Sequence, residues 1–141
     1  MTRPTKIVGG MNMKQRIGVA SALALVAMLV VVSAQAPAIE RVVLQRADLS
    51  AQGREGVQAK AMFPAPGATT GRHTHPGEEI SYVLEGTVKL EVDGQPPRDL
   101  KAGDFFIVPA EKIHNATSTS KAVVLATYVV EKGKPLTTPA K

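Results

Sequence analysis

Cysteine is absent from this sequence of 141 residues, so neither a disulfide nor a thiolate metal site can form. Tryptophan is absent as well, and the two tyrosines and three phenylalanines offer few rings for stacking on nucleic acid bases. After residue 40 the apolar residues also lack a helical period. These absences argue against a disulfide scaffold, a nucleic-acid-binding protein and a helical fold.

The positive charge of the chain is concentrated at its N-terminus. The sequence has 17 Lys and Arg against 12 Asp and Glu, a formal net charge of +5. Four of the basic residues precede a hydrophobic run: Arg3, Lys6, Lys14 and Arg16. From residue 35 onward, 13 basic residues stand against 12 acidic ones. This near balance gives no electrostatic reason to expect nucleic acid as a partner.

Residues 1–34 have the order of a secretory signal peptide. Residues 13–16 supply a positively charged start through Lys14 and Arg16, residues 17–32 are apolar and uncharged, and residues 33–38 are mostly small. We expect cleavage before Gln35, because a cut before Pro37 would place proline beside the scissile bond. The alternative is an uncleaved inner-membrane anchor, since residues 17–39 carry no charge and are long enough to span a bilayer. Without a cysteine for lipid attachment or a twin arginine, we expect general secretion to the periplasm or the medium.

The rest of the chain has the pattern of short β-strands. Residues 57–63 and 87–92 alternate apolar and polar side chains, whereas residues 105–109 and 122–130 are apolar and rich in β-branched residues. Glycine and proline separate these runs. We therefore predict an all-β, antiparallel sandwich or barrel at residues 57–130. An N-terminal extension with a first strand precedes it at residues 35–56, and an extended tail follows it at residues 131–141. Because so short a chain buries a modest core, a homodimer is expected.

The three histidines follow a pattern that suits a metal site. His73 and His75 are two residues apart, so in a strand they project from the same face. A Pro-Gly pair and a carboxylate follow, and His114 comes after a second run marked by glycine and proline. Three imidazoles and one carboxylate suit first-row divalent metals and leave positions open for water or substrate. A lone His-x-His pair is common on solvated strands, but such a pair does not explain the position of His114.

These residues match the first motif of the cupin family, which the sequence resembles. That motif is Gly, five residues, His-x-His, three or four residues, Glu, six residues, Gly. It is matched here by Gly67, His73, His75, Glu79 and Gly86. By this resemblance Glu79 is the ligand, and Glu78 is its neighbour on the opposite face.

The second cupin motif is Gly, five residues, Pro-x-Gly, two residues, His, three residues, Asn, and it is matched in part. Gly103, Pro109 and His114 stand at the family's spacing. Glu111 replaces the family's glycine, which implies either a turn that needs no positive φ or a strained one. Ser118 replaces the asparagine, and it has the parity to line the cavity as a shorter polar group. The resemblance implies a jelly-roll barrel, also called a double-stranded β-helix, with one metal held by His73, His75, Glu79 and His114.

The resemblance does not select one reaction, because cupins include enzymes, sensors and storage proteins. One hypothesis is an exported metal-dependent enzyme, dioxygenase-like or isomerase-like, that acts on a small molecule, with Glu79 able to serve as a base. Another is a protein that binds or senses a small molecule through the metal without turnover, and a third is a barrel that the metal merely stabilises. The candidate ions are Zn, Cu, Fe, Mn and Ni. Outside the cytoplasm the affinity order favours zinc or copper.

Overall fold

The computed structural model describes residues 35–141, and the predicted leader at 1–34 lies outside the described residues. The described chain is all β, as predicted, and contains no helix that is long and apolar enough to cross a membrane. Its ten strands are β1 (Glu40–Asp48), β2 (Arg54–Phe63), β3 (His73–Thr74), β4 (Gly77–Glu85), β5 (Thr87–Val92), β6 (Arg98–Lys101), β7 (Phe105–Val108), β8 (His114–Ser118), β9 (Ala122–Glu131) and β10 (Thr138–Pro139).

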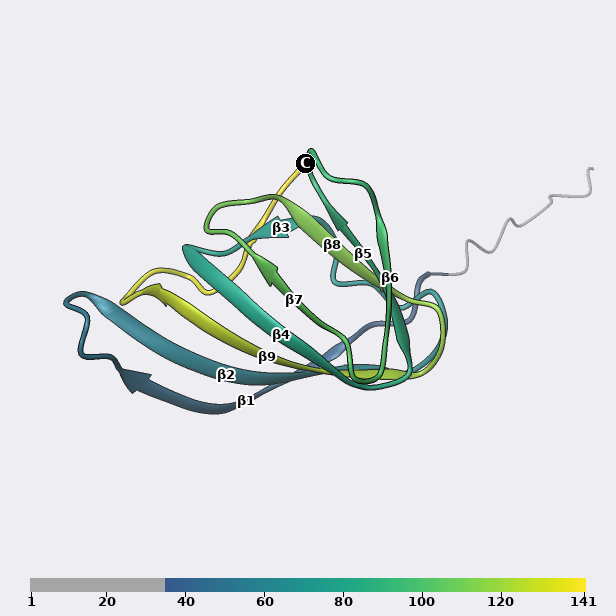
Figure 1. Cartoon of the computed structure of the whole chain (residues 1–141), viewed down its shortest axis with the longest axis horizontal. Helices are drawn as coiled ribbons and strands as arrows, with labels where there is room; N and C mark the ends of the chain where they lie inside the picture. Colours follow the sequence, from purple (N-terminus) through teal and green to yellow (C-terminus); the bar gives the residue numbers. More distant parts are fainter. Residues whose placement is uncertain (1–34) are drawn as a thin grey trace, which may run out of the picture. The chain divides into compact units, whose positions relative to one another are not determined.

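The strands form two five-stranded sheets, ordered β1-β2-β9-β4-β7 and β10-β3-β8-β5-β6. Every strand pairs antiparallel with its neighbours. In Figure 1 the long strands β1, β2, β9 and β4 lie side by side, and β5, β6 and β8 belong to the second sheet. This is the jelly-roll arrangement that the sequence predicts.

Alternating residues of the strands fill the space between the sheets. In β2 the side chains of Val57, Ala59, Ala61 and Phe63 are buried, and the residues between them are less so. The same alternation runs through β4, β5, β8 and β9. One buried cluster includes Phe63 and residues of both sheets, and a second joins β2 and β9. Tyr128 of β9 also lies in this second cluster.

The outer face of β4 and β7 remains apolar and exposed. Ile80 lies opposite Ile107 and Tyr82 lies opposite Phe105 in the β4–β7 pairing. All four side chains are exposed, from 45% for Ile80 and Tyr82 to 68% for Phe105. Tyr82 therefore faces away from the barrel interior, because it projects from the opposite face of β4 to Glu79.

Candidate metal centre

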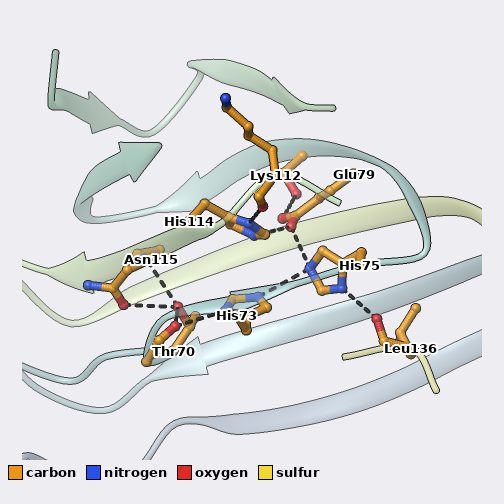
Figure 2. Close-up of polar contacts among 11 residues, drawn as sticks. Thr70, His73, His75, Glu79, Lys112, His114, Asn115 and Leu136 are labelled. Carbon is orange, nitrogen blue, oxygen red and sulfur yellow. Dashed lines mark hydrogen bonds and ion pairs between the residues drawn. The ribbon is translucent and has the colours of Figure 1, made fainter. Parts of the chain in front are cut away.

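The four predicted ligands come from three segments and meet inside the barrel. His73 lies on β3 and is paired with His114 on β8, whereas Glu79 lies on β4 in the other sheet. His75 stands between β3 and the turn that begins β4. All four residues are buried, and one donor atom from each lies within 4.8 Å of the others. Figure 2 shows their side chains pointing toward one another.

The distances within the cluster fit a small cation at its centre. The Nε2 atoms of His73 and His75 are 3.1 Å apart, and Glu79 Oε2 lies 3.0 Å from His75 Nε2 and 3.1 Å from His114 Nε2. Metal–ligand bonds of about 2.1 Å put neighbouring donors about 3.0 Å apart around a six-coordinate ion and about 3.4 Å apart around a tetrahedral one. The observed spacings lie near these values, so the four side chains would be able to hold one small divalent cation.

Backbone carbonyls fix which ring nitrogen of each histidine carries the proton. Nδ1 of His73 donates to Gly71 O at 2.8 Å, and Nδ1 of His114 donates to Lys112 O at 2.9 Å. Nδ1 of His75 donates to Leu136 O at 2.6 Å, a contact drawn in Figure 2. A carbonyl oxygen only accepts, so in the neutral rings all three Nε2 atoms carry lone pairs. Lone pairs that face each other and a carboxylate repel unless a positive charge lies between them, and this donor set fits a divalent metal.

The charge states in the cluster support the same conclusion. Burial lowers the pKa of His73 from 6.5 to about 4, so this imidazole is neutral and ready to bind a metal at pH 7. Burial alone would raise the pKa of Glu79, but the contacts of its carboxylate with the imidazoles of His114 and His75 and with the Ser81 hydroxyl hold this pKa below its usual range. Glu79 is therefore ionised. Three neutral nitrogens and one carboxylate leave a bound divalent ion with net positive charge.

Two residues that support the site were not predicted from the sequence. The hydroxyl of Ser81 donates to Glu79 Oε1 at 2.6 Å, and the shared parity of the two residues on β4 was the signal for it. Leu136 lies in the segment expected to be an extended tail, but that segment returns to the barrel, where β10 pairs with β3. No local pattern in residues 132–141 pointed to a contact with His75.

The two departures from the second motif have structural consequences. Glu111 has a φ of 58°, so the strained alternative applies, and its N–H donates to His75 O at 2.9 Å. Ser118 is buried on the inner face, as its parity predicts. Its hydroxyl donates to the carbonyls of Ala65 and Ala68 at 2.7 and 3.2 Å, so it holds that loop. Glu78 is exposed on the outer face, opposite to Glu79.

The cupin domain family matches residues 62–131, which include all four candidate ligands. The chain belongs to the cupin superfamily. This cupin resembles a solved cupin superfamily protein from Desulfitobacterium hafniense with a TM-score of 0.58 and 21% identity, over 70% of this chain and 83% of the other. That likeness supports the fold alone.

Two curated relatives share part of the cupin's sequence. The HTH-type transcriptional regulator PuuR of Escherichia coli is 33% identical over an alignment of 98 residues that covers 59% of this chain and 52% of the regulator. Dimethylsulfoniopropionate lyase DddQ of Ruegeria pomeroyi is 43% identical over 47 residues, 33% of this chain and 23% of the lyase. The chain thus spans about half the length of the regulator and less of the lyase.

Proposed function

We propose that this cupin is an exported protein in which His73, His75, Glu79 and His114 hold one divalent transition metal, and that it acts with this metal as an enzyme on a small molecule. The observation that carries the proposal is the meeting of three Nε2 lone pairs with an ionised carboxylate in a buried cluster. When bound, the metal would supply Lewis acidity or oxygen activation, for an isomerase-like or dioxygenase-like reaction.

Glu79 and Tyr128 have different roles in the proposed site. A carboxylate whose pKa lies below its usual range is a poor proton acceptor. We therefore assign Glu79 to holding the ion and not to serving as a base. Tyr128 packs against His75, with ring centroids 4.6 Å apart, and burial and then Glu79 raise its pKa, so its hydroxyl stays protonated. That hydroxyl is a hydrogen-bond donor for a ligand beside the metal.

A second candidate is a protein that binds or senses a small molecule without turnover. All three histidines of the chain are used in the cluster and cysteine is absent, so neither residue type is left for proton transfer. One sequence relative is a transcriptional regulator and another is a lyase, so relatives support both candidates. The candidates differ in whether the ligand is released unchanged.

The first test is metal analysis of protein purified from its native compartment without added metal. We expect about one zinc or copper per chain, because the affinity order favours these ions outside the cytoplasm. Iron or manganese as the dominant metal would contradict that argument, and native protein free of transition metal would refute the metal centre. His114→Ala should lose the metal, whereas Glu78→Ala, on the opposite face of β4 from Glu79, should keep it.

The second test separates the two candidates. The metal-loaded protein is screened for oxygen uptake and product formation with diols, thiols and phenols. Turnover that is lost in His114→Ala and kept in Glu78→Ala would support the enzyme. Tight binding of a compound that is recovered unchanged would support the binding protein.

We also propose that the cupin is a homodimer, with the exposed apolar face of β4 and β7 at its interface. Ile80, Tyr82, Phe105 and Ile107 form an apolar patch of paired side chains, which monomers rarely leave exposed. Ile107→Lys should convert a dimer to a monomer in light scattering. A wild-type monomer at micromolar concentration would refute this proposal.

A further inference from the structure

Arg41 is the one residue of β1 that is not exposed. It lies opposite Ala61 of β2, and Ala61 belongs to the buried core, so Arg41 points to the inner face of the sheet. Its Nε atom is buried and has no hydrogen-bond partner. Among residues 35–141 it is the only buried side-chain nitrogen or oxygen in that condition. A buried donor without a partner costs stability, so its presence calls for an explanation.

The other arginine on the inner face of β1 differs in this respect. Arg46 lies opposite Val57 and forms an ion pair with the buried carboxylate of Glu55. Arg41 has no ion-pair partner in the described part of the chain. Arg41 is half-buried, and no carboxylate in the described part of the chain pairs with its charge.

Arg41 faces the same barrel interior as the metal centre. Tyr128, which is paired with Glu79 and packs on His75, is a buried residue of that interior. In the sheet register, Ala59 and Ala126 lie between the position of Arg41 and that of Tyr128. Both alanines are buried and have short side chains.

We propose that Arg41 and Tyr128 form an anion subsite beside the metal centre, and that the small-molecule ligand of this cupin carries a carboxylate that binds there. A guanidinium offers a planar set of donors that matches a carboxylate, and the Tyr128 hydroxyl adds another donor. A divalent ion with Glu79 retains positive charge, and Arg41 adds to it, so an anionic ligand is favoured over a neutral one.

One of the two residues of this subsite, Arg41, comes from a part of the chain outside the matched cupin domain. The domain match begins at residue 62, whereas β1 ends at Asp48. Ligand preference would thus come from the added N-terminal strand, while the metal ligands come from the shared domain. The inference rests on the proposed function in placing the ligand at the metal, but anion binding by Arg41 can be measured without metal.

The test uses malonate as a probe, with malonamide as its neutral counterpart of similar shape. Binding is measured by calorimetry to the zinc-loaded and to the metal-free full chain. We expect wild-type protein to prefer malonate by at least about tenfold, in keeping with a charged hydrogen bond. Arg41→Met should bind malonate about tenfold to a hundredfold more weakly. Tyr128→Phe should show a smaller loss, and Arg98→Gln, on the opposite sheet, should bind as wild type does.

The variants also separate a binding role from a structural one. Because methionine removes a buried donor without a partner and keeps the length of the side chain, Arg41→Met should melt at or above the wild-type temperature. Its zinc affinity in a chelator competition should be unchanged. A variant that fails to fold or melts well below wild type would show that Arg41 is structural and would overturn the proposal.

The failure of this inference is distinguishable from the failure of the metal centre. If wild type binds zinc but binds malonate no better than malonamide, or if Arg41→Met binds malonate as wild type does, the subsite is wrong and the metal centre stands. If the protein binds no transition metal but still loses malonate affinity in Arg41→Met, the subsite stands and the proposed function fails.

Discussion

Removal of the C-terminal segment should weaken metal binding, although the segment contains no ligand. A chain that ends at Lys134 lacks Leu136, whose carbonyl accepts the Nδ1 proton of His75 at 2.6 Å. It also lacks β10, which pairs with β3 beside His73. The His75 ring would then be free to rotate, and its Nδ1 proton could exchange with Nε2, which would remove the lone pair from the site.

The expected size of this effect follows from the contacts that are lost. Removing the hydrogen-bond partner of a ligating histidine typically costs about 10- to 100-fold in metal affinity. Leu136 also packs against the buried cluster of β2 and β9. Because Leu136 is only partly buried, we expect the loss of its side chain to cost about 1–2 kcal/mol, below the range for a fully buried leucine.

Zinc affinity is measured by competition with a chelator, and stability by urea denaturation of the metal-free protein. Leu136→Ala is the matched control, because it loses the packing but keeps the backbone carbonyl. We expect Leu136→Ala to lose stability and to retain zinc affinity within about threefold, whereas the shortened chain should lose both. If the shortened chain binds zinc as tightly as the full chain does, the carbonyl of Leu136 does not orient His75 and the reasoning fails.

Three further predictions concern the turns and the titration of the site. Glu111→Gly should raise the free energy of unfolding by up to about 1 kcal/mol, because glycine tolerates the φ of 58°. Glu111→Ala should not raise it, and a loss of stability in Glu111→Gly would contradict the proposed backbone strain. Gly77→Ala should cost at least about 2 kcal/mol in thermal unfolding, because its Cβ would stand 2.0 Å from Val129 O; a wild-type melting temperature would refute this. In metal-free protein, burial lowers the pKa of His73 from 6.5 to about 4, so the unfolded chain binds the proton first. Stability should therefore fall as the pH drops from 6.5 toward 4, and it should fall less in His73→Gln. If urea denaturation shows the same dependence of stability on pH in both proteins, the prediction is wrong.

The inward faces and the metal cluster could be predicted from the sequence because both depend on period-two spacing. Once His73 is placed on a strand, the directions of its neighbours follow, and Val88, Leu90 and Val92 on β5 are buried as the alternation requires. The motif spacing then identified Glu79, and not Glu78, as the carboxylate that faces inward. These are local rules, and they hold wherever the strand is regular.

Features that depend on contacts between distant segments were not predictable in this way. The contact of Leu136 with His75 joins residues 61 positions apart, and nothing in a tail rich in lysine, threonine and proline indicates where it docks. The lack of a hydrogen-bond partner for Arg41 was also not predictable, because a basic residue in an exposed edge strand is normally expected to be solvated. Local spacing says which way a side chain points, but not which partner it lacks.

The position of the metal centre also bears on whether the ion has a purely structural role. Its ligands come from both sheets, since His73 and His114 lie on one and Glu79 on the other. A bound ion would therefore link the sheets and stabilise the folded chain in proportion to its affinity, whether or not a small molecule binds. A purely structural centre, however, gains nothing from an unpartnered arginine on the inner face. The unpartnered Nε of Arg41 is a cost to stability that ligand binding would offset, and this agrees with our proposal that the centre binds a small anionic molecule.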